Sequence, residues 1–167
     1  MKDRVREAVF NLIGPAVKGT IALDLFAGTG ALGIEALSRG AASAIFVERH
    51  FPTAELIRQN LAVLEAADRG TVLPANVLLW PRRLPPVLLS PDATQKPWLV
   101  FCSPPWDLFA EQAAEMVALL ETLLARAPTG SLWVVEADEK WDFGKLPQAD
   151  QWAIRAYPPA VIGILKT

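Results

Sequence analysis

The sequence is poor in the residues that build disulfides and metal sites. It holds one cysteine, Cys102, and one histidine, His50, among 167 residues. A lone cysteine excludes an internal disulfide, and a lone histidine without other ligands at a suitable spacing indicates no metal site. We therefore expect no metal, a solvated His50, and a Cys102 that packs inside an apolar strand rather than acting as a nucleophile.

Long apolar runs are also missing, although 52% of the residues are hydrophobic and the mean hydropathy is +0.27. No stretch approaches the roughly 18 consecutive apolar residues of a membrane-spanning helix. No basic and apolar signal segment opens the chain. The apolar surplus therefore predicts one sizeable core, a single domain over residues 1–167, no membrane partner and a cytoplasmic location.

Positive charge is not in excess, since 16 Lys and Arg residues stand against 18 Asp and Glu residues and the pI is near 5.4. A protein that binds free nucleic acid is usually basic. Binding to RNA would therefore depend on local clusters, and the sequence offers Arg4 with Arg6 and Arg82 with Arg83. Each cluster taken alone is more typical of a solvated surface.

Short apolar runs rich in β-branched residues alternate along the chain with patterns of helical spacing. An amphipathic helix at 3–13 occupies an N-terminal segment 1–15, a core follows at 20–137, and an antiparallel hairpin closes the chain at 151–166. This alternation predicts an α/β, Rossmann-like fold with a doubly wound, mostly parallel sheet and the hairpin at its edge. The prolines of 81–97 predict a long connection rather than a helix interior or a central strand. The expected strands are 21–25, 44–48, 71–73, 98–102 and 131–136, and the expected helices are 31–39, 52–67 and one helix through 109–124.

A glycine-rich loop follows the first expected strand. Residues Gly28 to Gly33 match the pattern G-x-G-x-x-G between a strand and a helix, which brings backbone N–H groups close to a bound ligand. Two cofactor classes use this pattern, the nicotinamide dinucleotides and S-adenosyl-L-methionine. In a doubly wound sheet the ligand lies beyond the carboxyl ends of the strands, so we expect the site beside the end of the first strand.

Acidic residues at two successive strand ends help to separate these cofactor classes. Asp24 lies four residues before Gly28. We expect it at the mouth of the site, where its charge would repel a pyrophosphate and suit a cofactor that carries a sulfonium and an ammonium. Glu48 ends the second strand and can accept hydrogen bonds from both ribose hydroxyls of either cofactor. The alternative is a capping or solvated Asp24 and an exposed Glu48 beside Arg49, but the paired placement favours the cofactor site.

The fourth expected strand ends in Ser103-Pro104-Pro105-Trp106, at the same edge of the sheet as Asp24. Two prolines cannot continue a central strand, so the chain turns there. The prolines expose rigid carbonyl oxygens, and Trp106 offers a face on which a planar base can stack. This tetrapeptide therefore predicts an acceptor site for an amino group.

Two segments carry a family resemblance, residues 2–13 (KDRVREAVFNLI) and residues 24–41 (DLFAGTGALGIEALSRGA), together with the strand end Phe46-Val47-Glu48. They resemble the RsmD-type 16S ribosomal RNA guanine-N2 methyltransferases, most strongly within the first 60 residues. The resemblance implies a class I methyltransferase that uses S-adenosyl-L-methionine. Its methyl acceptor would be the N2 amine of a guanine in ribosomal RNA. Its partner would be a small-subunit particle that contains this RNA. We expect a monomer.

The residues expected to form the site fall into three groups. The catalytic candidates are Ser103, Pro104, Pro105 and Trp106. The candidates for RNA contact are Arg4, Arg6, Trp106, Arg82 and Arg83. The candidates for cofactor binding are Asp24, Phe26, Ala27, Gly28, Thr29, Gly30, Glu48, Arg49, Asn76 and Val77.

The chain departs from the family pattern in three places. It begins almost at Asp3, without the upstream segment thought to meet RNA. Asn76 replaces an acidic residue near the adenine, although its carbonyl oxygen can still accept a hydrogen bond from the adenine amine. Ser103 replaces the usual Asp or Asn, and a hydroxyl is a shorter, neutral acceptor for the target amine. Three hypotheses stay open: an active RNA guanine-N2 methyltransferase, a cofactor-binding RNA-associated module with weak or lost catalysis, and, less favoured, an NAD-dependent oxidoreductase.

Overall fold

A computed structural model describes residues 1–167 and places a seven-stranded sheet at the centre of the molecule. The strand order is β3-β2-β1-β4-β5-β7-β6. Strands β1 to β5 run parallel, β7 lies antiparallel to β5, and β6 pairs with β7 at the outer edge. This order confirms the doubly wound sheet with a C-terminal hairpin. The strands are β1 (Ile21–Asp24), β2 (Ser43–Val47), β3 (Gly70–Leu73), β4 (Trp98–Cys102), β5 (Leu132–Asp138), β6 (Ala153–Tyr157) and β7 (Ala160–Lys166).

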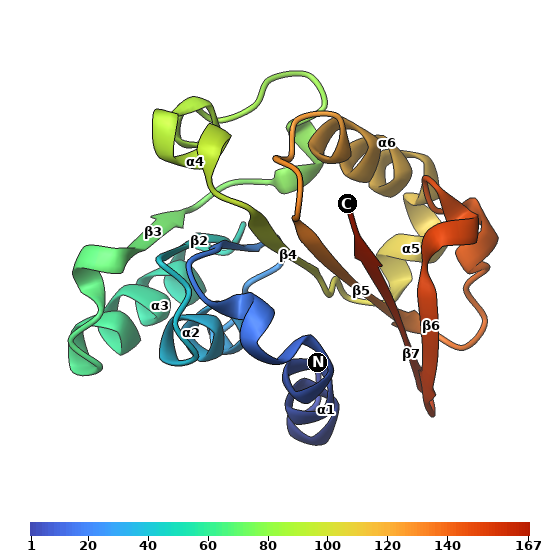
Figure 1. Cartoon of the computed structure of the whole chain (residues 1–167), viewed down its shortest axis with the longest axis horizontal. Coiled ribbons are helices and arrows are strands. Elements are labelled where there is room, and N and C mark those ends of the chain that lie inside the picture. The colour runs from blue at the N-terminus through green and yellow to red at the C-terminus, as the bar shows by residue number, and fades with distance from the viewer.

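Helices cover both faces of this sheet (Figure 1). The first three helices lie against one face, and the last two lie against the other. None of the helices has the length and apolar content needed to cross a membrane. The helices are α1 (Asp3–Ile13), α2 (Ala31–Ser38), α3 (Phe51–Val63), α4 (Pro91–Gln95), α5 (Asp107–Glu111) and α6 (Ala113–Leu124).

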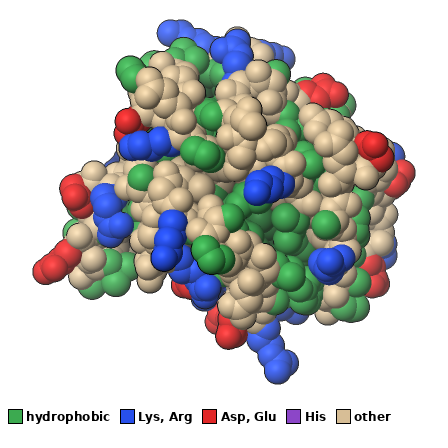
Figure 2. Space-filling view, viewed as in Figure 1, with side chains coloured by type: hydrophobic (Ala, Val, Ile, Leu, Met, Phe, Trp, Pro, Cys, Tyr) green, Lys and Arg blue, Asp and Glu red, His purple; other side chains and the backbone are tan.

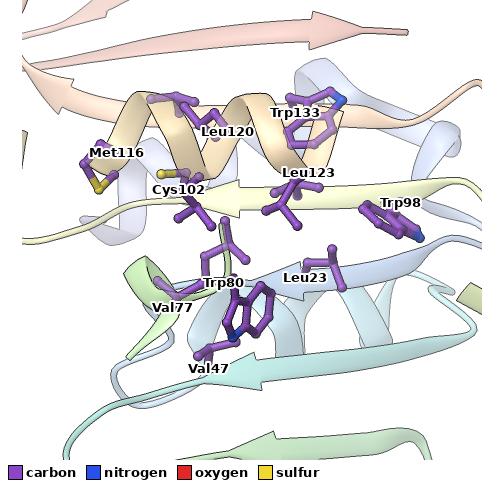
Figure 3. Close-up of a cluster of buried hydrophobic side chains, with 14 of the residues drawn as sticks. Leu23, Val47, Val77, Trp80, Trp98, Cys102, Met116, Leu120, Leu123 and Trp133 are labelled. Carbon is purple, nitrogen blue, oxygen red and sulfur yellow. The ribbon is translucent and has the colours of Figure 1, made fainter. Parts of the chain in front are cut away.

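Each face of the sheet has its own apolar core, because successive side chains of a strand point to opposite faces. In β1, Leu23 belongs to the core under α6, whereas Ala22 belongs to the core under α1, α2 and α3. Cys102, at the end of β4, is fully buried in the first of these cores beside Met116 and Leu120 of α6 (Figure 3). Burial raises the pKa of the Cys102 thiol far above its usual range. Cys102 is therefore the inert core residue that the sequence predicts.

The proline-rich connection before β4 contains helical turns. A 3-10 turn at Pro86–Leu89 and helix α4 each begin with a proline. The Ser90 hydroxyl oxygen caps α4 by accepting a hydrogen bond from the Ala93 N–H at 3.3 Å. Proline is favoured at the first position of a helix, where the backbone N–H has no partner to lose. These prolines therefore start short helices, although they would break the interior of a long one.

Two helices differ from what their apolar spacing predicts, one because it is divided and the other because it ends early. The expected helix through 109–124 is divided into α5 and α6, because Gln112 adopts φ −132° and ψ 41° between them. Helix α3 ends at Val63 instead of residue 67, and Glu65 follows it with a positive φ of 52°. Hydrophobic spacing reports which face of a helix is buried, but it does not report such local backbone conformations.

Candidate cofactor and acceptor site

A cavity of about 380 Å³ lies beyond the carboxyl ends of β1, β2 and β4. Its position is the one expected for the ligand of a doubly wound sheet, and its volume is within the usual range for small-molecule sites. We call it the cofactor cavity. Most of its wall comes from the ends of β1, β2, β3 and β4 and the segments that follow them. The lining residues are Met1, Leu25, Phe26, Gly28, Val47, Glu48, Arg49, Ala75, Asn76, Val77, Leu78, Ser103, Pro104, Pro105, Leu108 and Gln112.

The glycine loop forms one wall of the cofactor cavity, and its glycines are needed for different structural reasons. Gly28 and Gly30 adopt positive φ angles of 52° and 85°, which other residues rarely adopt. Gly33 lies inside α2, where a Cβ atom would be only 2.3 Å from the ring of Phe46. Gly33 therefore allows α2 to pack closely on β2, and the loop that precedes α2 stays close to the strand ends.

Asp24 does not lie at the mouth of the cavity, which corrects the expectation from the sequence. Its side chain is 1% exposed and is not part of the cavity wall. Its Oδ2 accepts a hydrogen bond from the Gly33 N–H at 3.0 Å. Asp24 therefore ties the end of β1 to the first turn of α2, and it cannot repel a pyrophosphate by facing it.

The environment of Asp24 also changes its ionisation. Burial raises the pKa of this carboxyl from 3.8 to about 7. The hydrogen bond from Gly33 and the charge of the Met1 amino group act in the opposite direction, and the nearby charge of Glu48 adds to the increase. A group that must stay partly neutral at pH 7 is typical of a buried structural carboxyl as well as of an active site.

Glu48 faces the cofactor cavity from the end of β2 and organises the loops around it. Its Oε2 accepts the Gly28 N–H at 2.9 Å, and its Oε1 accepts the His50 N–H at 2.8 Å. Each carboxylate oxygen can accept more than one hydrogen bond, so both retain capacity for hydroxyl groups in the cavity. The strand-end acid that the sequence indicates therefore lines the cavity, and its binding of a ribose stays a prediction.

Asn76 lines the cavity after β3, but its side chain is also used within the chain. Its Oδ1 accepts the Leu78 N–H at 3.1 Å and caps the 3-10 turn Val77–Leu79. The side-chain NH₂ group makes no hydrogen bond within the chain. Asn76 can therefore donate a hydrogen bond to a heterocyclic ligand through this group and accept one through Oδ1. Of the other cofactor candidates, Phe26, Gly28, Arg49 and Val77 line the cofactor cavity, Ala27 and Thr29 line a smaller hollow beside the loop, and Gly30 lines neither.

A second cavity of about 610 Å³ lies between the start of α1 and the turn of the C-terminal hairpin. We call it the acceptor cavity. Trp106 lines this cavity and not the cofactor cavity, whereas Ser103, Pro104 and Pro105 line the cofactor cavity. The tetrapeptide after β4 is therefore the wall between the two. The lining residues of the acceptor cavity are Lys2, Asp3, Arg4, Val5, Trp106, Glu136, Ala156, Tyr157, Pro158, Pro159 and Ala160.

The hydroxyl of Ser103 is held at this wall by a buried acid that the sequence analysis does not single out. Ser103 Oγ donates a hydrogen bond to Glu136 Oε2, across the neighbouring strands β4 and β5. Glu136 is 3% exposed. The amino nitrogen of Met1 lies 3.4 Å from Ser103 Oγ and 3.3 Å from Glu136 Oε2. The available signal was a carboxylate directly after the apolar run Leu132–Val135, where a strand residue is expected to be buried.

The basic residues expected to contact RNA do not all gather at the site. Arg4 lines the acceptor cavity, and Arg6 lines the hollow beside the glycine loop while pairing with Asp3 at 2.9 Å. Arg82 and Arg83 line a different hollow, away from both cavities. Lys and Arg side chains are spread over the face shown in Figure 2 and do not form one patch. Positive charge at the acceptor cavity therefore comes from Lys2 and Arg4 at the start of α1, and at the cofactor cavity it comes from Arg49.

A family model described as Conserved hypothetical protein 95 matches residues 1–156 of the chain. The chain belongs to this family. The match bears out the resemblance to the RsmD-type family, and curated relatives are similar in sequence. YlbH of Bacillus subtilis (strain 168) is 50% identical over 70 residues, which are 42% of this chain and 38% of YlbH. Ribosomal RNA small subunit methyltransferase D of Escherichia coli (strain K12) is 46% identical over 70 residues, which are 42% of this chain and 35% of that protein.

These alignments span little more than a third of each curated relative. Similarity of structure extends further in this RsmD-type family. The solved structure of yhhF from Escherichia coli matches this chain with a TM-score of 0.77 and 26% sequence identity. The match covers 98% of this chain and 85% of the yhhF chain. The Rossmann-like class I methyltransferase fold expected from the sequence is therefore confirmed.

Proposed function

We propose that the protein transfers a methyl group from S-adenosyl-L-methionine to the N2 amine of a guanine in small-subunit ribosomal RNA. The observation that carries this proposal is that two cavities meet at one wall, Ser103 to Trp106. One cavity has the position and size of a cofactor site, and the other has an aromatic side chain on which a base can stack. The name of the Escherichia coli relative supports ribosomal RNA as the substrate.

The residues of the cofactor cavity fit S-adenosyl-L-methionine. Glu48 retains acceptor capacity for the two ribose hydroxyls, and Asn76 with Val77 offers polar and apolar contacts to the adenine. The cofactor supplies a methyl group on a sulfonium, and the electron pair of the broken C–S bond stays with the sulfur. The N2 lone pair of guanine forms the new N–C bond, and the nitrogen then loses a proton to water.

The wall between the cavities orients the nucleophile in this proposal. Ser103 Oγ accepts a hydrogen bond from one N2 hydrogen, which directs the nitrogen lone pair toward the cofactor cavity. Its own hydrogen goes to Glu136 Oε2, so the hydroxyl oxygen can accept from the amine once the amine replaces the Met1 amino group, which donates to this oxygen at 3.4 Å. Trp106 stacks on the extruded base, and Pro104 and Pro105 keep the wall rigid.

The experiment that tests this proposal is a labelled-methyl transfer assay on unmodified small ribosomal subunits and on their naked RNA, followed by mapping of the modified nucleotide. We expect transfer to a guanine N2, with the folded particle as the better substrate because the chain has a net charge of −2. Binding of S-adenosylhomocysteine without any transfer would support the alternative of a methyltransferase scaffold that has lost its chemistry. Binding of NAD without binding of S-adenosylhomocysteine would refute the proposal.

A further inference from the structure

Glu136 is a buried carboxylate at the junction of the two cavities. It lies near the end of β5 and is 3% exposed, yet it lines the acceptor cavity together with Trp106 and Tyr157. Its Oε2 contacts the Ser103 hydroxyl and the Met1 nitrogen, while its Oε1 has no hydrogen-bond partner in the chain. Because Glu136 lines the acceptor cavity, its Oε1 is available to accept a hydrogen bond from a ligand there.

We propose that Glu136 selects guanine by accepting a hydrogen bond from the ring N1–H of the target base, beside the N2 amine. This inference rests on the proposed methyl transfer to N2. Guanine alone among the common bases has a ring N–H next to an amino group on its Watson–Crick edge. Adenine and cytosine present a lone pair on the corresponding ring nitrogen, and uracil has no amino group. An ionised carboxylate can only accept, so it matches guanine and repels the lone pairs of the other two amino-bearing bases.

A nitrogen donor already lies beside the acceptor oxygens of Ser103 and Glu136. The Met1 nitrogen lies within 3.4 Å of both Ser103 Oγ and Glu136 Oε2, so a nitrogen donor can be held between them. Because Oε2 accepts the Ser103 hydrogen, Ser103 Oγ can accept from N2 while Oε1 accepts from N1. The target base then takes the place of the Met1 nitrogen.

The rest of the acceptor cavity suits a nucleotide. Trp106 and Tyr157 supply aromatic rings on which a base can stack, and Lys2 and Arg4 supply positive charge from the start of α1 for the adjoining phosphates. Asp3 and Glu136 are the other charged residues of the cavity wall. Glu136 is the one of these four charged residues that also contacts Ser103.

Three nucleosides test the assignment without requiring catalysis. Guanosine has both N1–H and the N2 amine, inosine keeps N1–H but lacks the amine, and 2-aminopurine riboside keeps the amine but has a lone pair at N1. Each is titrated by calorimetry into the protein saturated with S-adenosylhomocysteine. We expect the wild-type protein to bind guanosine and inosine about tenfold or more tighter than 2-aminopurine riboside, the discrimination typical of a hydrogen bond to a charged group.

Glu136→Gln supplies the decisive comparison, because an amide can accept from Ser103 and donate to the N1 of 2-aminopurine. We expect the guanosine to 2-aminopurine affinity ratio to fall by about tenfold or more in this variant. The matched control is Glu139→Gln on the exposed surface just after β5, which should keep the wild-type ratio. Equal affinities in the wild-type protein, or an unchanged ratio in Glu136→Gln, would overturn the inference. Failure of methyl transfer to ribosomal particles would instead count against the proposed function, since these titrations do not depend on turnover.

Discussion

The buried carboxyl of Asp24 makes the free energy of unfolding depend on pH in an unusual direction. Its pKa is about 7 in the folded chain against an ordinary value of 3.8. Between these values the folded state holds a proton that the unfolded state has lost, so stability falls as pH rises from about 4 to about 7. One pKa unit corresponds to about 1.36 kcal/mol, so the full effect of this carboxyl is about 4 kcal/mol.

Asp24→Asn removes this titration and keeps an oxygen that can accept the Gly33 N–H hydrogen bond. We expect the variant to become more stable relative to wild type as pH rises, with the difference growing by about 2–3 kcal/mol between pH 5 and pH 8. Urea unfolding of both proteins at pH 5, 6, 7 and 8 measures this difference. Groups that titrate in both proteins cancel in the comparison.

Asp68→Asn is the matched control, because Asp68 is exposed and its replacement should give a difference that does not vary over this range. A constant difference between wild type and Asp24→Asn from pH 5 to pH 8 would refute the reasoning. It would mean that the Asp24 carboxyl ionises in the folded chain as readily as it does in the unfolded chain.

Four further substitutions test the site and the packing of α2 beside it. Ser103→Ala should lower the rate of single-turnover methyl transfer by on the order of 10²-fold, while Ser103→Asn should transfer at least as fast as wild type. The affinity of both variants for S-adenosylhomocysteine should change little. Equal transfer rates in wild type and both variants would contradict the orienting role of Ser103. Glu48→Ala should weaken S-adenosylhomocysteine binding by about tenfold or more in calorimetry, because it removes the ribose acceptors and the partner of the Gly28 N–H. Gly33→Ala should destabilise the fold by about 1–3 kcal/mol in urea unfolding, since the added Cβ would overlap the Phe46 ring; wild-type stability would show that α2 shifts freely.

Local patterns in the sequence were sufficient to predict the sheet and the position of the site. The apolar runs at 21–25 and 98–102 became neighbouring parallel strands, and the residues that follow them line one cavity. Parallel strands bring their carboxyl ends to one edge of the sheet, so strand order in the chain already indicates which loops meet. Glu48 and the Ser103-Pro104-Pro105 run were identified in this way.

Side-chain direction and pairing between distant strands could not be predicted from the same patterns. Asp24 ends β1 and Glu48 directly follows β2, yet the Asp24 side chain bonds to the Gly33 N–H while Glu48 faces the cavity. Trp106 lies only three residues beyond Ser103 but faces the other cavity. The direction of each side chain depends on which helix packs over it, and the sequence does not state that packing.

The sequence by itself therefore determined the fold class, the family and the edge of the sheet that carries the site, because periodicity, turn residues and motif spacing are local properties. Only the tertiary structure brought Glu136 to Ser103, since these residues are 33 positions apart and meet through the pairing of β4 with β5. Only the tertiary structure divided the site into two cavities, because the wall of the acceptor cavity joins the first turn of α1 to the C-terminal hairpin. Contacts between the two ends of a chain depend on how the whole sheet closes, and no local pattern encodes them.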